Sequence, residues 1–183
     1  LEILFAGVLV ESKGVRVLLE AFMKLVASGV DGRLRIMGRW NEEPLRAWAM
    51  NFVANNRLTG KVEFLGVLSG AEKNARFAAC DIFCFPSWFE AESFGLVLVE
   101  AMQFAKPVVS TLWRGIPSVV ENGVNGFLVP VQDADAVAEK LLALARDPDL
   151  RRRMGEAGRR IFEERFTLEA FHRRMESELA ALA

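Results

Sequence analysis

Two glutamates eight positions apart, Glu92 and Glu100, flank the segment of this sequence that is best suited to binding chemistry. Ser93 follows the first glutamate and is a residue type that often caps a helix start. A helix that begins there leaves the amides of residues 94–96 as unpaired donors at the positive end of the helix dipole. Such a helix start binds anions, so the segment predicts a phosphate site.

Glu100 is expected to be buried, because apolar residues surround it within the helix predicted over 94–104. A buried carboxylate is costly unless donors reach its oxygens. Two sources of donors remain open. One is the protein itself, through Lys106, Arg114 or a backbone amide, and the other is a pair of hydroxyl groups on a ligand.

A hydrolytic pair made of Glu92 and Glu100 is disfavoured by their spacing. Eight residues of helix span about 12 Å, whereas the paired carboxyl groups of glycosidases lie about 5 to 9.5 Å apart. The longer separation suits an extended ligand whose two hydroxyl-bearing ends flank a diphosphate.

Lys13 lies just before a second predicted helix, over 15–27, where a positive charge opposes the helix dipole. It is either an ordinary surface lysine or a ligand for an anion that would remove this unfavourable interaction.

His172 is the only histidine, and we expect it on the surface of the tail and not in the role of a base.

The elements that must position these residues alternate along the chain. Apolar runs predict strands at 1–6, 34–37, 62–65, 82–85, 107–110 and 126–129, and helical spacing predicts helices at 15–27, 42–55, 71–79, 94–104 and 133–145. This alternation predicts an α/β fold, a Rossmann-like parallel six-stranded sheet with helices on both faces. Gly7, Gly38 and Gly66 each follow an apolar run, where they serve either as turn residues only or as points of close approach to a ligand.

The domain organisation expected from this pattern is a single domain over 1–183. A Rossmann-like core occupies 1–145, and a C-terminal helical appendage occupies 146–183. Within the appendage, Gly155 and Gly158 are expected to interrupt a short helix. Thr167 is a plausible N-cap of the last helix, with Ala170 at the third helical position.

Composition indicates a globular protein, because 52% of the residues are hydrophobic and the 23 basic residues are balanced by 24 acidic ones. This balance gives no reason to expect a nucleic acid partner.

Cys80 and Cys84 are expected to be buried thiols in a reducing compartment. The most apolar stretch, 95–105, is too short for a membrane span, so we expect a cytoplasmic protein that is at most peripheral at the inner membrane surface. The chain starts without methionine inside an apolar run, as a fragment cut at a domain boundary would.

The segment 86–102 closely resembles the donor-binding motif of the retaining glycosyltransferases of the GT-B fold, glycosyltransferase family 4, also called group 1. That family's pattern is P-S, then E-x-F-G, then E-A-M, with seven residues between the glutamates. The matching residues here are Pro86-Ser87, Glu92-Ser93-Phe94-Gly95, Glu100-Ala101-Met102 and the following Lys106-Pro107-Val108-Val109. Similarity extends over the whole chain, through Lys13-Gly14, Val62-Glu63-Phe64-Leu65-Gly66, Gly115-Ile116-Pro117, Glu121-Asn122-Gly123-Val124-Asn125-Gly126, Asp147-Pro148-Asp149-Leu150-Arg151 and Met154-Gly155.

The resemblance implies one half of a GT-B fold, the donor-binding domain, with the N-terminal acceptor domain absent. It implies a metal-independent hexosyltransferase that moves a sugar with retention from a nucleoside diphosphate of the UDP, GDP or ADP type. The acceptor would be lipid-linked or a saccharide, and this chain alone would bind donor without turnover.

The resemblance also implies roles for individual residues. Glu92 would hold hydroxyls of the donor sugar, and Lys13 would neutralise the departing diphosphate in place of a metal ion. Donor-binding residues would be Glu100 at the ribose, Ser93, Phe94, Gly95 and Leu96 at the phosphates, and Gly7, Arg39, Val67 and Leu68 around the base and the strand ends.

Three positions depart from the family pattern. Val8 stands where the family usually has an arginine that clamps phosphate, Ser118 replaces a glutamate, and the stretch 103–105 lacks the usual glycine. These departures motivate an alternative, a non-catalytic nucleotide-sugar-binding module that has lost turnover. A nucleotide hydrolase is disfavoured, because the sequence has neither a Walker loop nor a G-x-G-x-x-G motif at its first turn.

Overall fold

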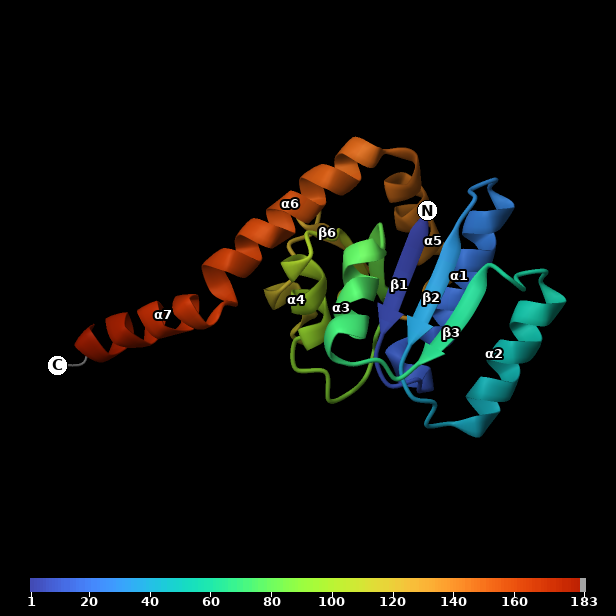
Figure 1. Cartoon of the computed structure of the whole chain (residues 1–183), viewed down its shortest axis with the longest axis horizontal. Helices are drawn as coiled ribbons and strands as arrows, with labels where there is room; N and C mark the ends of the chain where they lie inside the picture. The colour runs from blue at the N-terminus through green and yellow to red at the C-terminus, as the bar shows by residue number, and fades with distance from the viewer. Residues whose placement is uncertain (182–183) are drawn as a thin grey trace.

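The computed structural model describes residues 1–181 as an α/β domain with a helical extension (Figure 1). Its strands are β1 (Glu2–Ala6), β2 (Arg33–Met37), β3 (Val62–Gly66), β4 (Ile82–Phe85), β5 (Val108–Thr111) and β6 (Gly126–Val129). Its helices are α1 (Val15–Ala27), α2 (Glu43–Asn55), α3 (Gly70–Ala79), α4 (Leu96–Gln103), α5 (Ala134–Arg146), α6 (Pro148–Arg165) and α7 (Leu168–Ala181). Short 3₁₀ helices cover η1 (Glu11–Lys13) and η2 (Ile116–Ser118).

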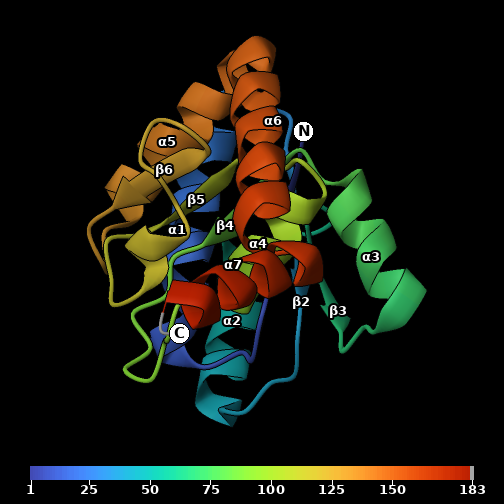
Figure 2. The same ribbon diagram turned by 90° about the vertical axis from the view of Figure 1, so that its left-hand side faces the viewer.

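The strands form one parallel sheet in the order β3-β2-β1-β4-β5-β6. Helices α1 and α5 cover one face, and α3 and α4 cover the other (Figure 2). This confirms the predicted Rossmann-like six-stranded sheet. Strand order reverses between β1 and β4, and a ligand crevice is expected at such a switch point, outside the carboxyl ends of the strands.

Burial explains why the strands occupy these places. The central strand β4 is buried along its whole length, as is β1 from Ile3 onward, which suits apolar runs covered by helices on both faces. At the edge of the sheet, β3 has only half-buried and exposed residues, because one of its sides has no neighbouring strand. The apolar content of each run therefore matches its position in the sheet.

The start of α4 differs from the prediction. The helix begins at Leu96 and its N-cap is Gly95, which adopts a left-handed conformation with φ +73° and makes no side-chain capping bond. Ser93 was therefore wrong as the N-cap. Ser93 lies two residues before the N-cap, in a bend of the chain. Its carbonyl oxygen packs closely against Gly115.

The predicted interruption of the tail helix was also wrong, because α6 runs unbroken through Gly155 and Gly158. Both glycines are buried. A Cβ placed on Gly155 would lie 2.0 Å from the carbonyl oxygen of Ala105, so glycine at this position lets α6 pack closely on the end of α4.

Helix α7 extends away from the body of the molecule (Figure 1) and packs mainly against α6. Its start is confirmed, since the Ala170 amide donates to Thr167 Oγ1 at 3.1 Å. Four apolar side chains of α7 are exposed, Leu168, Phe171, Met175 and Leu179, and His172 is exposed as expected. Within residues 1–181 no helix is long and apolar enough to cross a membrane.

Candidate functional site

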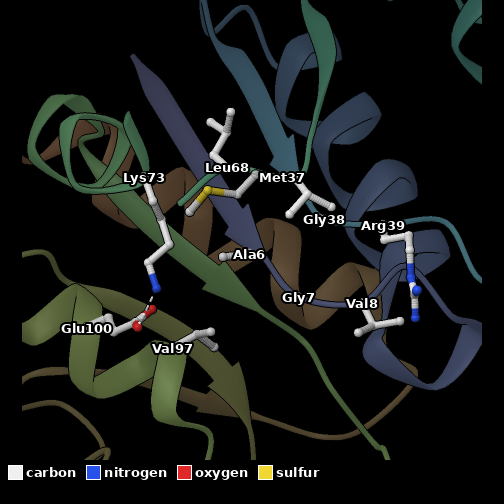
Figure 3. Close-up of a pocket in the computed structure, with 11 residues that line it drawn as sticks. Ala6, Gly7, Val8, Met37, Gly38, Arg39, Leu68, Lys73, Val97 and Glu100 are labelled. Carbon is white, nitrogen blue, oxygen red and sulfur yellow. Dashed lines mark hydrogen bonds and ion pairs between the residues drawn. The ribbon is translucent and has the colours of Figure 1, made fainter. Parts of the chain in front are cut away.

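A cavity of about 470 Å³ opens at the carboxyl ends of β1, β2 and β3 and reaches α3 and α4 (Figure 3). It lies beside the switch point of the sheet, where a ligand crevice is expected. The residues that line it are Ala6, Gly7, Val8, Met37, Gly38, Arg39, Val67, Leu68, Lys73, Val97 and Glu100.

The strand ends at this cavity are joined by backbone hydrogen bonds. The Gly7 amide donates to Met37 at 3.1 Å, and the Gly38 amide donates to Gly66 at 2.8 Å. A Cβ on Gly38 would lie only 1.7 Å from the Gly7 carbonyl oxygen. The three glycines therefore lie side by side at the strand ends, with a close backbone approach that requires glycine at position 38.

Glu100 lies at one end of the cavity, on α4. Its Oε1 accepts a hydrogen bond from Lys73 Nζ at 2.6 Å, while its Oε2 is buried and has no donor among the described residues. The side chain is 34% exposed, so the expected burial of Glu100 is met at Oε2 but not over the whole side chain. The expected protein donors were wrong as well: Lys73 on α3 pairs with the carboxylate, whereas Lys106 donates to the Ala78 carbonyl.

Lys13 and Glu92, which come from opposite halves of the core, form a second group. Lys13 Nζ lies 2.6 Å from Glu92 Oε2, and the two side chains are only 15% and 9% exposed. The buried Ser87 donates to the same carboxylate oxygen at 3.1 Å and accepts from the Phe89 amide at 3.2 Å. Glu92 lies outside α4, so the distance estimate that assumed eight helical steps between the two glutamates does not apply.

Phe85, at the end of β4, is the common neighbour of these two groups. Its ring centroid lies 5.4 Å from Lys13 Nζ. A Cβ on Gly7 would lie 3.5 Å from the ring, and one on Gly95 would lie 3.6 Å from it. Phe85 is 2% exposed, so its buried ring lies next to both Gly7 of the cavity lining and Lys13 of the ion pair.

A left-handed glycine places Lys13 at this point. Gly14 has φ +84° and separates η1 from α1. A Cβ there would lie 2.1 Å from the Pro86 carbonyl oxygen, and the Trp88 amide donates to Ser12 at 2.7 Å. The Lys13-Gly14 turn therefore packs directly against the Pro86-Ser87 turn.

The structure separates the predicted binding residues into two sets. Five of them line the cavity: Gly7, Arg39, Val67, Leu68 and Glu100. Six lie outside the cavity lining: Lys13, Glu92, Ser93, Phe94, Gly95 and Leu96. Sequence reasoning missed Lys73, because a lysine on an amphipathic helix carries no local sign that its partner lies 27 residues away.

Of the charged side chains that line the cavity, some have an ion-pair partner within residues 1–181 and one does not. Lys73 is paired with Glu100, whereas no ion pair or hydrogen bond in the described part of the chain engages the guanidinium of Arg39. Val8 lies beside Arg39 at the opposite end of the cavity from Glu100 (Figure 3) and is 42% exposed. The cavity therefore has an acceptor group at one end and an available cation at the other.

Neither cysteine is poised for nucleophilic chemistry, and both are free and buried as expected. Burial raises the pKa of the Cys80 thiol to about 12 and raises the pKa of Cys84 further still. Between residues 1 and 181 no group of three His, Cys, Asp or Glu side chains is arranged to hold a metal ion.

Several named proteins are similar to this chain in sequence or in fold. Residues 1–161 match the family described as glycosyl transferases group 1. The phosphatidyl-myo-inositol mannosyltransferase of Mycobacterium leprae is 39% identical over 146 residues, which are 80% of this chain and 37% of that protein. The N-acetyl-alpha-D-glucosaminyl L-malate synthase of Bacillus anthracis is 35% identical over 157 residues, 86% of this chain and 39% of that protein.

A crystal structure of HepE from Anabaena in complex with UDP superposes on 98% of this chain and 48% of its own, with a TM-score of 0.87 and 25% identity. The chain thus spans less than half the length of these relatives. The family match over most of its residues and the shared fold establish that this chain belongs to the group 1 glycosyltransferases.

Proposed function

We propose that this chain is the donor-binding domain of a retaining glycosyltransferase that transfers a hexose from a nucleoside diphosphate to an acceptor. The observation that carries the proposal is the cavity at the switch point, with Glu100 at its α4 end and the Lys13–Glu92 pair beside Phe85. A nucleotide sugar has matching features in the same order. It carries ribose hydroxyls, an anionic diphosphate and sugar hydroxyls.

Each group then has a defined role. Glu100 accepts hydrogen bonds from ribose hydroxyls, and Glu92 accepts them from hydroxyls of the sugar. Lys13 moves from Glu92 toward the diphosphate and stabilises the charge of the leaving group, which is electrostatic catalysis without a metal ion. The amides of Phe94 and Gly95, in the turn before α4, and of Leu96, its first residue, bind the phosphates.

The remaining cavity residues receive the base. Val67 and Leu68 follow β3 and, with Arg39 and Gly7, provide apolar surface and backbone groups against which a planar ring packs. The relative HepE is described in complex with UDP, which supports a nucleoside diphosphate ligand here. We propose a donor of the UDP, GDP or ADP type.

The acceptor site belongs to a second domain in this proposal. The chain covers 37% of the mannosyltransferase and 48% of HepE, which leaves room in those proteins for another domain. One relative is named a phosphatidyl-myo-inositol mannosyltransferase, which supports a lipid-linked acceptor, and a saccharide is the other acceptor that we propose. A cytoplasmic enzyme, peripheral at the inner membrane surface, suits such acceptors.

The test is calorimetric titration of the 183-residue chain with UDP, GDP, ADP and their sugars. We expect one nucleotide to bind, and expect Glu100→Ala and Lys13→Ala to weaken binding by about 10- to 100-fold each, the loss of a charge-assisted contact. Glu43→Ala, a surface glutamate outside the cavity, is the matched control. No binding by any nucleotide, or binding indifferent to both site variants, would contradict the proposal.

A non-catalytic nucleotide-sugar-binding module is the second candidate, favoured by Val8 and Ser118. Val8 adds no charge to the cavity, and the Ser118 hydroxyl is engaged locally by the Gly115 carbonyl at 2.6 Å. Full-length protein supplied with donor and candidate acceptors separates the two. Sugar release or transfer supports the enzyme, whereas tight binding with no turnover supports the module.

A further inference from the structure

Lys73 and Glu100 form an ion pair whose two side chains both line the cavity (Figure 3). The side chains are 32% and 34% exposed, so a ligand in the cavity can reach them. An ion pair this accessible contributes little stability, because water screens it and two flexible side chains must be ordered. Its position on the cavity wall therefore points to a role in binding.

Both partners have unused hydrogen-bonding capacity. An ammonium group carries three N–H donors, and the single acceptor of Lys73 Nζ among residues 1–181 is Glu100 Oε1. Glu100 Oε2 is buried without a donor. Rotation about the terminal torsion of a glutamate is soft, so the carboxylate can turn to meet an incoming hydroxyl.

We propose that Lys73 and Glu100 act as one unit that recognises a vicinal diol, in which Glu100 accepts from the hydroxyl hydrogens and Lys73 donates to a hydroxyl oxygen. Each hydroxyl group is both a donor and an acceptor, so a diol can satisfy both partners at once. The proposal rests on the proposed function, since the diol is the ribose of the nucleotide. Lys73 is a positioning residue for Glu100 and also a direct contact.

No second cation can take over this role from within the cavity. Arg39, the other cationic residue of the lining, lies at the opposite end of the cavity (Figure 3). Without Lys73, the Glu100 carboxylate loses its hydrogen-bond donor and is free to adopt other rotamers. Recognition of the diol should then disappear even though Glu100 is present.

The experiment compares ribonucleotides with their 2′-deoxy forms. The chain and its Lys73→Met and Lys73→Arg variants are titrated with UDP, GDP and ADP and with the corresponding 2′-deoxynucleotides. We expect the original chain to prefer the ribonucleotide by about tenfold, the value of one hydrogen bond to a charged group. Lys73→Met should weaken ribonucleotide binding by about 10- to 100-fold and bring the deoxy-to-ribo ratio of Kd close to one, while Lys73→Arg restores much of the preference.

Lys61→Met is the control, since Lys61 also pairs with a carboxylate, Asp31 at 3.0 Å, but does not line the cavity. It should leave the ratio unchanged. If no nucleotide binds the original chain, the proposed function itself fails. If Glu100→Ala weakens binding but Lys73→Met keeps the ribose preference, only the role of Lys73 is overturned. Lys73→Gln replaces Lys73→Met in the same comparison if circular dichroism shows that the methionine variant is unfolded.

Discussion

Lys13 Nζ lies 2.6 Å from Glu92 Oε2, although 79 residues separate the two in the chain. Both side chains are mostly buried, and Ser87 donates to the same oxygen. The pair therefore joins the turn after β1 to the turn after β4 across the switch point of the sheet. It links the stability of the domain to the geometry of its proposed catalytic residues.

Removal of either partner should destabilise the fold. Lys13→Met or Glu92→Gln leaves a largely buried group without its partner, and we expect each to lower the free energy of unfolding by about 1–3 kcal/mol. The double variant should cost less than the sum of the two, by at least about 0.5 kcal/mol. Urea unfolding followed by circular dichroism measures all three.

The control for these three variants is Arg46→Gln. It breaks an exposed ion pair with Glu43 and should change the free energy of unfolding by less than about 0.5 kcal/mol. Strict additivity of Lys13→Met and Glu92→Gln would show that the contact is not energetically coupled.

Val8→Arg should strengthen the binding of nucleoside diphosphates. Val8 is exposed on the cavity wall, so a guanidinium there can reach a phosphate without displacing buried side chains. A charge-assisted contact is worth about 1.5 to 3 kcal/mol, or roughly 10- to 100-fold in Kd. Calorimetry with a nucleoside and its diphosphate checks this, and Val8→Met controls for side-chain size. An equal gain for the uncharged nucleoside would contradict a phosphate contact.

Gly14→Ala should destabilise the fold by more than the left-handed conformation of Gly14 alone explains. The substitution adds left-handed strain of about 1–2 kcal/mol and a Cβ only 2.1 Å from the Pro86 carbonyl oxygen. Gly29→Ala is the matched control, because Gly29 has φ +89° and nothing within 4 Å. Thermal unfolding should show a larger loss for Gly14→Ala, and nucleotide binding should fall only in that variant. Equal losses in the two variants would rule out a packing role for Gly14.

The cysteines should resist alkylation in the folded protein. Because burial raises the pKa of Cys80 to about 12, its thiolate is scarce near pH 8, and iodoacetamide should label neither cysteine until urea is added. Mass spectrometry counts the added groups. The unfolded thiol loses its proton near pH 8.5 while the folded one keeps it, so stability should fall as pH rises from that value toward 12. Rapid labelling of the native chain would contradict this.

The sequence by itself determined the fold class and the order of its elements. Alternating apolar runs and helical periods placed α1 and β4 at their observed bounds, because burial on both faces of a parallel sheet demands that pattern locally. Glycines after three strands marked the edge where the cavity opens. The motif around Glu92 and Glu100 indicated the family to which the chain belongs.

Only the tertiary structure decided which residues meet. The partner of Glu100 is Lys73, and that of Lys13 is Glu92; neither pair has a local sequence signal, because α3 and α4 or two distant turns must first pack together. The same holds for Gly155, which suggests a helix interruption in the sequence but is needed because the Ala105 carbonyl oxygen, just after α4, leaves no room for a side chain. Ser93 failed as an N-cap because the turn before α4 is set by the left-handed Gly95. Short-range patterns decide elements, whereas contacts between distant segments depend on how those elements pack.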